Sequence, residues 1–209
     1  TNDETKNAFL QDDRIILNMG GEKLELISRN KLRLLGLHNV ANVMCASLAA
    51  YHCGIPIDSI RKTLKEFRSV EHRLEFVAEK KGVTYINDSK GTNPDASMIA
   101  LKAIDKPIVL IMGGYDKKSD FTEMFELIRE KVKHIVVLGQ TKKQIIETAE
   151  KCGYDALTAV DDYNQAVEVC ATIAKSGDCV LLSPACASWG MFENYEQRGK
   201  LFKELVQGL

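Results

Sequence analysis

Residues 88–93 carry a carboxylate, an amine and two hydroxyls within six positions, Asp-Ser-Lys-Gly-Thr-Asn. They follow the largely apolar residues 83–86, and Asn93 and Pro94 then suit the N-cap and the first turn of a helix. Because the start of a helix offers free N–H groups and the positive end of its dipole, this loop predicts a binding site for an anion. An ordinary turn with solvated polar residues is the alternative interpretation.

Two more loops place polar side chains directly after apolar runs. Residues 113–118 read Gly-Gly-Tyr-Asp-Lys-Lys, where two glycines allow a tight turn and either Lys117 or Lys118 offers a positive charge to a carboxylate or phosphate. Residues 183–188 read Ser-Pro-Ala-Cys-Ala-Ser, and small hydroxyl residues beside backbone N–H groups suit an anion. Taken singly, each loop also fits a turn without function.

Apolar patterning predicts alternating strands and helices from residue 74 onward. Strands are expected at 74–78, 83–86, 107–112, 134–138, 156–160 and 179–182, and helices at 94–103, 121–131, 142–152, 163–175 and 193–206. This alternation predicts an α/β fold with a doubly wound, mostly parallel sheet. The carboxyl ends of parallel strands meet at one edge, so the three loops are expected to line one crevice and to favour an anionic small molecule.

The N-terminal part has a different pattern. Residues 14–19 and 24–28 flank Gly20-Gly21 as a hairpin would, and helices are expected at 39–51 and 59–67, the second capped by Asp58. The core of such a hairpin is too small to stand alone, and a hairpin followed by two helices resembles the end of a larger domain. We therefore interpret residues 1–67 as the end of one domain and residues 68–209 as a second domain.

Composition excludes several classes of function. The 209 residues include 28 basic and 29 acidic side chains, so no overall field favours nucleic acid or a membrane surface. No apolar run approaches the roughly 18 residues of a membrane span, and the N-terminal residues do not resemble a signal peptide. The six cysteines lack C-x-x-C spacing, which is typical of a reduced, cytoplasmic protein. Neither common glycine-rich phosphate-binding motif occurs.

Two residue pairs outside the three loops also suit ligand binding. His72-Arg73 combines a side chain that binds metals or moves protons with one that binds phosphate, although a solvated linker pair would read the same. Asn39 and Asn42 share one face of the expected helix, where their amides can bind a base edge or merely cap the helix.

Several motifs, taken together in this order, resemble the Mur ligases, and among them the members that add D-glutamate. The motifs are His-Asn-Val-Ala-Asn at 38–42, His-Arg-Leu-Glu at 72–75, Asn-Asp-Ser-Lys-Gly-Thr-Asn at 87–93, Gly-Gly-Tyr-Asp-Lys at 113–117, Leu-Ser-Pro-Ala-Cys-Ala-Ser at 182–188 and Asn-Tyr-Glu-Gln-Arg-Gly at 194–199. The resemblance implies a three-domain ligase of peptidoglycan synthesis. Residues 1–67 would then end the central ATP-binding domain, and residues 68–209 would form the Rossmann-like domain that receives the amino acid.

The resemblance also implies roles for individual residues in binding the amino acid. Thr92 and Lys117 would hold one carboxylate of D-glutamate. Ser188 and the backbone near Tyr195 would hold the other. Gly91 and Gly190 depart from the alanine and aspartate that are usual in the family, and Tyr195 replaces a common phenylalanine.

A second group of residues would meet the nucleotide. Asn39 and Asn42 would flank the adenine. As the domains close, Arg73, Asp88 and Lys90 would reach the nucleotide. His72 would lie near a second magnesium ion, and Lys90, Arg73 and His72 are the predicted catalytic residues.

The implied reaction uses ATP and Mg²⁺ to join UDP-N-acetylmuramoyl-L-alanine to D-glutamate through an acyl phosphate. A monomer that binds neither nucleic acid nor membrane is expected, and residues 1–209 alone are expected to be inactive because they lack a phosphate loop. Two alternatives remain. One is a binding module for an acidic metabolite that does no chemistry, and the other is a sibling ligase that adds another amino acid.

Overall fold

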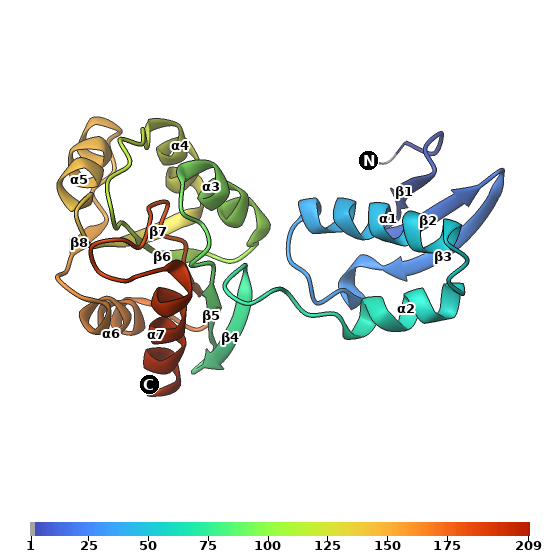
Figure 1. Cartoon of the computed structure of the whole chain (residues 1–209). Helices are drawn as coiled ribbons and strands as arrows, with labels where there is room; N and C mark the ends of the chain where they lie inside the picture. The colour runs from blue at the N-terminus through green and yellow to red at the C-terminus, as the bar shows by residue number, and fades with distance from the viewer. Residues whose placement is uncertain (1–2) are drawn as a thin grey trace. The chain divides into compact units, whose positions relative to one another are not determined.

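The computed structural model describes residues 3–209. The chain divides into two compact units, the first ending at Ser69 and the second running from Val70 to Leu209 (Figure 1). Each unit has its own apolar core, so each is described by itself. Within the described residues, no helix combines the length and the apolar character that crossing a membrane requires.

The first unit is a three-stranded antiparallel sheet with two helices packed on it. Its elements are β1 (Ala8–Gln11), β2 (Arg14–Met19), β3 (Glu22–Ser28), the short 3₁₀ helix η1 (Arg29–Lys31), α1 (Leu37–His52) and α2 (Ile57–Glu66). The predicted hairpin is confirmed, and Gly20 and Gly21 adopt the positive φ angles, 65° and 103°, that its turn requires. Ile15 and Leu17 of β2 pack with Val43 of α1 in the core.

Two features of this unit differ from the prediction. The sequence did not reveal β1, which pairs with β2 and buries Phe9 completely. Asp58 was expected to cap α2, and this is wrong, because the N-cap is Pro56 and Asp58 lies in the first helical turn. The Asp58 carboxylate there lies 3.0 Å from the guanidinium of Arg61, so a pair one turn apart replaces the cap.

The second unit is a six-stranded sheet in the order β4-β5-β9-β6-β7-β8. The strands are β4 (Glu75–Lys80), β5 (Val83–Asn87), β6 (Ile108–Met112), β7 (Val132–Val137), β8 (Leu157–Ala159) and β9 (Cys179–Leu182). Only the β4–β5 pair is antiparallel, so the predicted mostly parallel sheet is confirmed. Every residue of β6 and β9 is buried, as expected for strands covered on both faces.

Helices cover both faces of this sheet (Figure 1). They are α3 (Pro94–Ala103), α4 (Thr122–Lys131), α5 (Lys142–Lys151), α6 (Tyr163–Ile173) and α7 (Tyr195–Gln207). One core contains buried side chains of α3, α4 and α5, and the other contains those of α6 and α7. Alternate residues of each central strand enter the two cores, which is the doubly wound arrangement that the sequence predicted.

The ends of elements follow local signals. Asn93 caps α3 by accepting a hydrogen bond from the N–H of Ala96 at 2.8 Å, as predicted. The last helix begins at Tyr195, two residues later than expected, because Asn194 accepts from the N–H of Gln197 and so acts as its N-cap. The strand expected from residue 134 begins at Val132, where it already pairs with Ile108.

Candidate functional site

Three polar loops emerge side by side at the carboxyl edge of the larger sheet. β9 lies between β5 and β6, and its last residue, Leu182, pairs with Asn87 on one side and Ile111 on the other. The loops 88–93, 113–118 and 183–188 therefore start next to one another, as the sequence predicted. Two surface concavities, of about 530 and 570 Å³, lie elsewhere in this unit, along residues 146–157 and 104–133.

Asp88 ties its loop to the loop after β9. Its side chain is buried, with Oδ2 accepting a hydrogen bond from the Ser183 hydroxyl at 2.8 Å and Oδ1 one from the N–H of Leu74 at 3.2 Å. Burial raises the pKa of Asp88 to about 6, and the hydrogen bonds from Ser183 and Leu74 and the charge of Arg73 act against this shift. Both carboxylate oxygens thus have protein partners in this structure.

The two glycines that depart from the family pattern have different local roles. Gly91 is buried, and a Cβ atom there would lie 2.6 Å from Asp88 Oδ2 and 2.8 Å from Ser183 Oγ. Glycine at this position therefore allows the carboxylate and the hydroxyl to meet. Gly190 has a φ of 85°, in the region that glycine adopts most readily, and nothing lies within 4 Å of an added Cβ.

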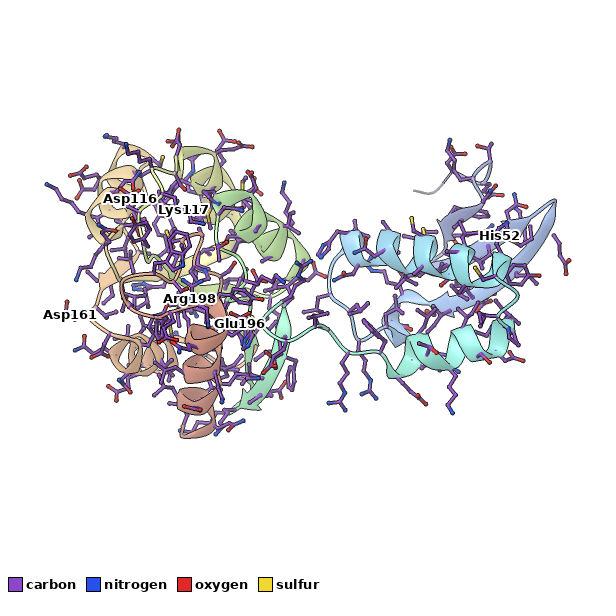
Figure 2. The ribbon with its side chains drawn as sticks, in the orientation of Figure 1. His52, Asp116, Lys117, Asp161, Glu196 and Arg198 are labelled. Atoms are coloured by element: carbon purple, nitrogen blue, oxygen red, sulfur yellow. The ribbon has the colours of Figure 1, made fainter. Side chains whose placement is uncertain are left out.

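Arg198 connects two of the loops to α7, and the sequence did not single it out. Figure 2 labels Arg198 near the start of α7. Its side chain is 1% exposed. Nε donates to Ser89 Oγ at 2.9 Å, Nη2 to the Ser89 carbonyl at 2.7 Å and Nη1 to the Cys186 carbonyl at 3.0 Å. The sequence did contain a signal for this buried arginine. Helical spacing places Arg198 on the same face as Phe202 and Val206, and a charge on such an apolar face needs hydrogen-bond partners.

His72 lies in a buried polar cluster at the start of β4. Its Nδ1 atom is 2.9 Å from Nδ2 of Asn87, and Glu75 accepts hydrogen bonds from both Asn87 and the backbone N–H of His72. The ligand atoms of Glu71, His72 and Glu75 all lie within 4.8 Å of one another. The Lys203 ammonium contacts both carboxylates, at 3.0 Å from Glu75, so a lysine already supplies the positive charge there.

This arrangement does not fit a resident magnesium ion. Magnesium requires a near-octahedral set of oxygen ligands, whereas these carboxylates are bound by an ammonium and His72 Nδ1 faces an amide. The place of His72 near a second magnesium ion stays a prediction, and the other ring nitrogen, Nε2, lies 3.8 Å from a Glu71 carboxylate oxygen.

Aromatic rings accompany two of the predicted cationic residues. The ammonium of Lys90 lies 5.3 Å from the centre of the Tyr195 ring, and the Tyr195 and His72 rings pack edge to face with their centres 6.1 Å apart. The ammonium of Lys117 lies 5.2 Å from the centre of the Trp189 ring. The structure therefore brings Lys90, Tyr195 and His72 together, and places Lys117 beside a residue that the sequence did not suggest.

The remaining predicted residues lie as follows. Thr92 is half-buried, and its N–H donates to the Lys90 carbonyl at 2.9 Å. Ser188 is buried at the end of its loop. In the first unit, Asn39 donates to the Leu35 carbonyl at 2.8 Å near the start of α1, and the side chains of Asn42 and Asn39 lie 3.4 Å apart. The neighbouring Asn pair predicted on one helix face is confirmed as a contact, while its role stays a prediction.

Asp88 makes the stability of the second unit depend on pH. Its pKa of about 6 in the folded chain lies above the ordinary 3.8, so the unfolded chain releases this proton at lower pH. The free energy of unfolding is expected to fall by about 2–3 kcal/mol between about pH 4 and pH 6, because one pKa unit corresponds to about 1.4 kcal/mol. Denaturant titrations of wild type and Asp88→Asn across this range measure the effect. A decline in the variant as steep as in the wild type would exclude Asp88 as its source.

Comparison with known proteins gives this site a context. The chain is 47% identical over 202 residues to the UDP-N-acetylmuramoylalanine–D-glutamate ligase of Lachnospira eligens, an alignment that covers 97% of this chain and 45% of that protein. The chain thus spans a little under half the length of the curated relatives that it matches.

Solved structures share the fold at low sequence identity. The UDP-N-acetylmuramate-alanine ligase MurC of Thermotoga maritima superposes with a TM-score of 0.66 at 16% identity, over 94% of this chain and 44% of its own. The folylpolyglutamate synthase of Mycobacterium tuberculosis, solved with ADP, superposes with a TM-score of 0.67 at 15% identity, over 90% of this chain and 44% of its own.

A family model agrees with both comparisons. The Mur ligase, glutamate ligase domain, matches residues 72–186, which run from the buried histidine to the loop after β9 and so include all three strands that carry the polar loops. On this match and on the high identity to curated D-glutamate ligases, the chain belongs to the Mur ligase family.

Proposed function

We propose that this chain is part of an ATP-dependent ligase that adds D-glutamate to UDP-N-acetylmuramoyl-L-alanine in peptidoglycan synthesis. The observation that carries the proposal is the meeting of the Lys90, Lys117 and Ser188 loops at one sheet edge. The sequence is also 47% identical to that of a UDP-N-acetylmuramoylalanine–D-glutamate ligase. The folylpolyglutamate synthase of the same fold holds ADP, which supports ATP as the co-substrate. Mg²⁺ would accompany the nucleotide.

The two units would divide the work. Residues 1–67 would end the central ATP-binding domain, where Asn39 and Asn42 flank the adenine. Residues 68–209 would receive the amino acid. We further propose that the complete protein acts in the cytoplasm, since it would use ATP and a UDP-linked substrate. We also propose that it acts as a monomer.

The amino-acid site must match two carboxylates on one small molecule. Lys117 and Thr92 would bind one carboxylate through an ammonium and a hydroxyl. Ser188 and the backbone near Tyr195 would bind the other at the start of α7, where a helix favours an anion. Charged hydrogen bonds of this kind are stronger than neutral ones, so a dicarboxylate would bind better than a neutral amino acid.

The chemistry needs the amine of D-glutamate beside an activated acyl group. ATP would phosphorylate the alanyl carboxylate and leave ADP. The neutral amine would then attack the acyl phosphate, and the tetrahedral intermediate would collapse to the amide and inorganic phosphate. Lys90 and Arg73 would balance the phosphate charge, while buried Asp88 connects the Lys90 loop to Leu74, the residue after Arg73, and to Ser183. Closure over the substrates would exclude water, which would otherwise hydrolyse the acyl phosphate.

Replacing Lys117 by alanine in the complete protein tests the assignment. Loss of a charged hydrogen bond costs about 1.5–3 kcal/mol, so the KM for D-glutamate is expected to rise by about 10- to 150-fold. The KM for ATP is expected to stay constant, because Lys117 binds only the amino acid. Phosphate release coupled to D-glutamate, with other amino acids as competitors, measures both constants.

Lys118→Ala is the matched control. Lys118 is the adjacent exposed lysine, with a φ of 60° and a backbone N–H that donates to the Asp116 carboxylate. It is expected to change the KM for D-glutamate little. If Lys118→Ala raises this KM and Lys117→Ala does not, the carboxylate is bound by Lys118 instead. If the wild-type protein joins no amino acid to UDP-N-acetylmuramoyl-L-alanine, the proposed function is wrong.

A further inference from the structure

An exposed aromatic patch borders the Lys117 loop. Tyr115 is 38% exposed, Trp189 53% and Met191 39%, and the rings of Tyr115 and Trp189 meet edge to face with their centres 5.6 Å apart. Large apolar side chains at a polar loop need an explanation, because folding gains little from leaving them in water. None of the three has a role in the proposed function.

The backbone beneath this patch is held firmly. Tyr115 forms an antiparallel bridge with Ala187, and its N–H donates to the Ala187 carbonyl at 2.9 Å. Just beyond Trp189, the N–H of Phe192 donates to the Ser188 carbonyl at 3.0 Å. Backbone hydrogen bonds thus flank Trp189 on both sides in sequence, and its ring contacts that of Tyr115 edge to face. The Trp189 ring therefore presents a supported aromatic surface beside the Lys117 loop.

The Lys117 ammonium lies on that surface. Its Nζ atom is 5.2 Å from the centre of the Trp189 ring, within the roughly 6 Å over which the face of an indole attracts a cation. The lysine side chain is otherwise exposed, and a flexible four-carbon stem would let the charge move over many positions. The ring restricts these positions before any ligand arrives, which lowers the entropy lost when a carboxylate binds.

We propose that Trp189 is a positioning residue for Lys117, holding its ammonium over the indole ring so that it meets a carboxylate of the amino-acid substrate. This inference rests on the proposed function of Lys117. The Lys90 ammonium likewise lies 5.3 Å from the centre of the Tyr195 ring, so the segment from Trp189 to Tyr195 supplies a ring to two of the predicted cationic residues. Trp189 touches neither substrate nor nucleotide in this proposal.

The effect belongs in substrate binding. The contact between Lys117 and the carboxylate is made before the reaction and persists through it, so weakening it raises KM and leaves kcat unchanged. In the complete protein, Trp189→Leu keeps an apolar side chain but removes the ring face, and it is expected to raise the KM for D-glutamate by about two- to fivefold. Trp189→Phe keeps a weaker ring and is expected to fall between Leu and wild type. Met191→Leu, in the same turn, is the control and is expected to leave KM unchanged.

A double-mutant cycle separates positioning from a general effect on the loop. If the ring acts through Lys117, then Trp189→Leu has no further effect on KM in a Lys117→Ala background. An equal effect in both backgrounds, or no effect in either, would overturn the inference. If Lys117→Ala itself leaves the KM for D-glutamate unchanged, the assignment of Lys117 in the proposed function fails first. That outcome is distinct from one in which Lys117 matters and Trp189 does not.

Discussion

The free energy of unfolding of the second unit is expected to fall by about 3–5 kcal/mol when Arg198 is replaced by methionine, because three buried acceptors lose a donor at about 1–3 kcal/mol each. Methionine fills a similar apolar volume, but it leaves the Ser89 and Cys186 carbonyls and the Ser89 hydroxyl without the donor that each now has. Buried carbonyls that lose a charged partner cost more than the hydrogen bonds themselves contributed. Guanidinium chloride unfolding, followed by a probe in the second unit, measures the change.

Two further variants define the cause of this loss. Arg198→Lys retains the charge but cannot make three hydrogen bonds in the guanidinium geometry, so an intermediate value is expected. Arg129→Met removes an exposed arginine from the same unit and is expected to change the free energy by less than about 0.5 kcal/mol. If Arg198→Met proves as mild as Arg129→Met, the buried guanidinium does not hold the loops together.

Gly113→Ala is the second change with a large expected effect. Gly113 follows β6 with a φ of 109°, and an added Cβ would lie 2.1 Å from the backbone oxygen of Leu138. That carbonyl cannot easily move, because the N–H of the same residue donates to Met112 at 3.2 Å. Strain and overlap together are expected to lower the free energy of unfolding by about 2–6 kcal/mol.

Gly177→Ala provides the matched control for this position. Gly177 has a similar φ, 97°, but nothing lies within 4 Å of an added Cβ. The two variants therefore share the backbone strain and differ in the overlap, which accounts for about 1–3 kcal/mol. Thermal or denaturant unfolding of both gives this difference directly. Equal losses would mean that the loops after β6 and β7 can separate without cost.

Much of the second unit could be predicted from local pattern. Its central strands are continuous apolar runs, and Asn93 and Pro94 mark the start of α3. The bounds predicted for these elements therefore lie at or near the observed ones. The arrangement of three loops at one edge followed from the rule for parallel strands. In the first unit, β1 was missed because its four residues carry no turn or alternation signal and become a strand only by pairing with β2.

The site was harder to predict, because its contacts join residues far apart in the sequence. The Lys90 and Tyr195 side chains meet across the sheet edge, as do those of Lys117 and Trp189, and no spacing rule connects them. Arg198 is buried by tertiary packing, so its role appears only once α7 is placed. For Asp58 the local cap signal was good but misleading, because α2 begins at Ile57 with Pro56 as its N-cap.

The order of the strands has a consequence for how the protein is made. β9 is the last strand along the described chain, yet it lies in the middle of the sheet and is the strand through which β5 and β6 are joined. On the ribosome, the β4–β5 hairpin and the β6–β7–β8 strands must therefore wait as two unjoined pieces until residues 179–182 emerge. The three polar loops can come together only in that late, long-range step, and until then the apolar edges of β5 and β6 are open to wrong partners.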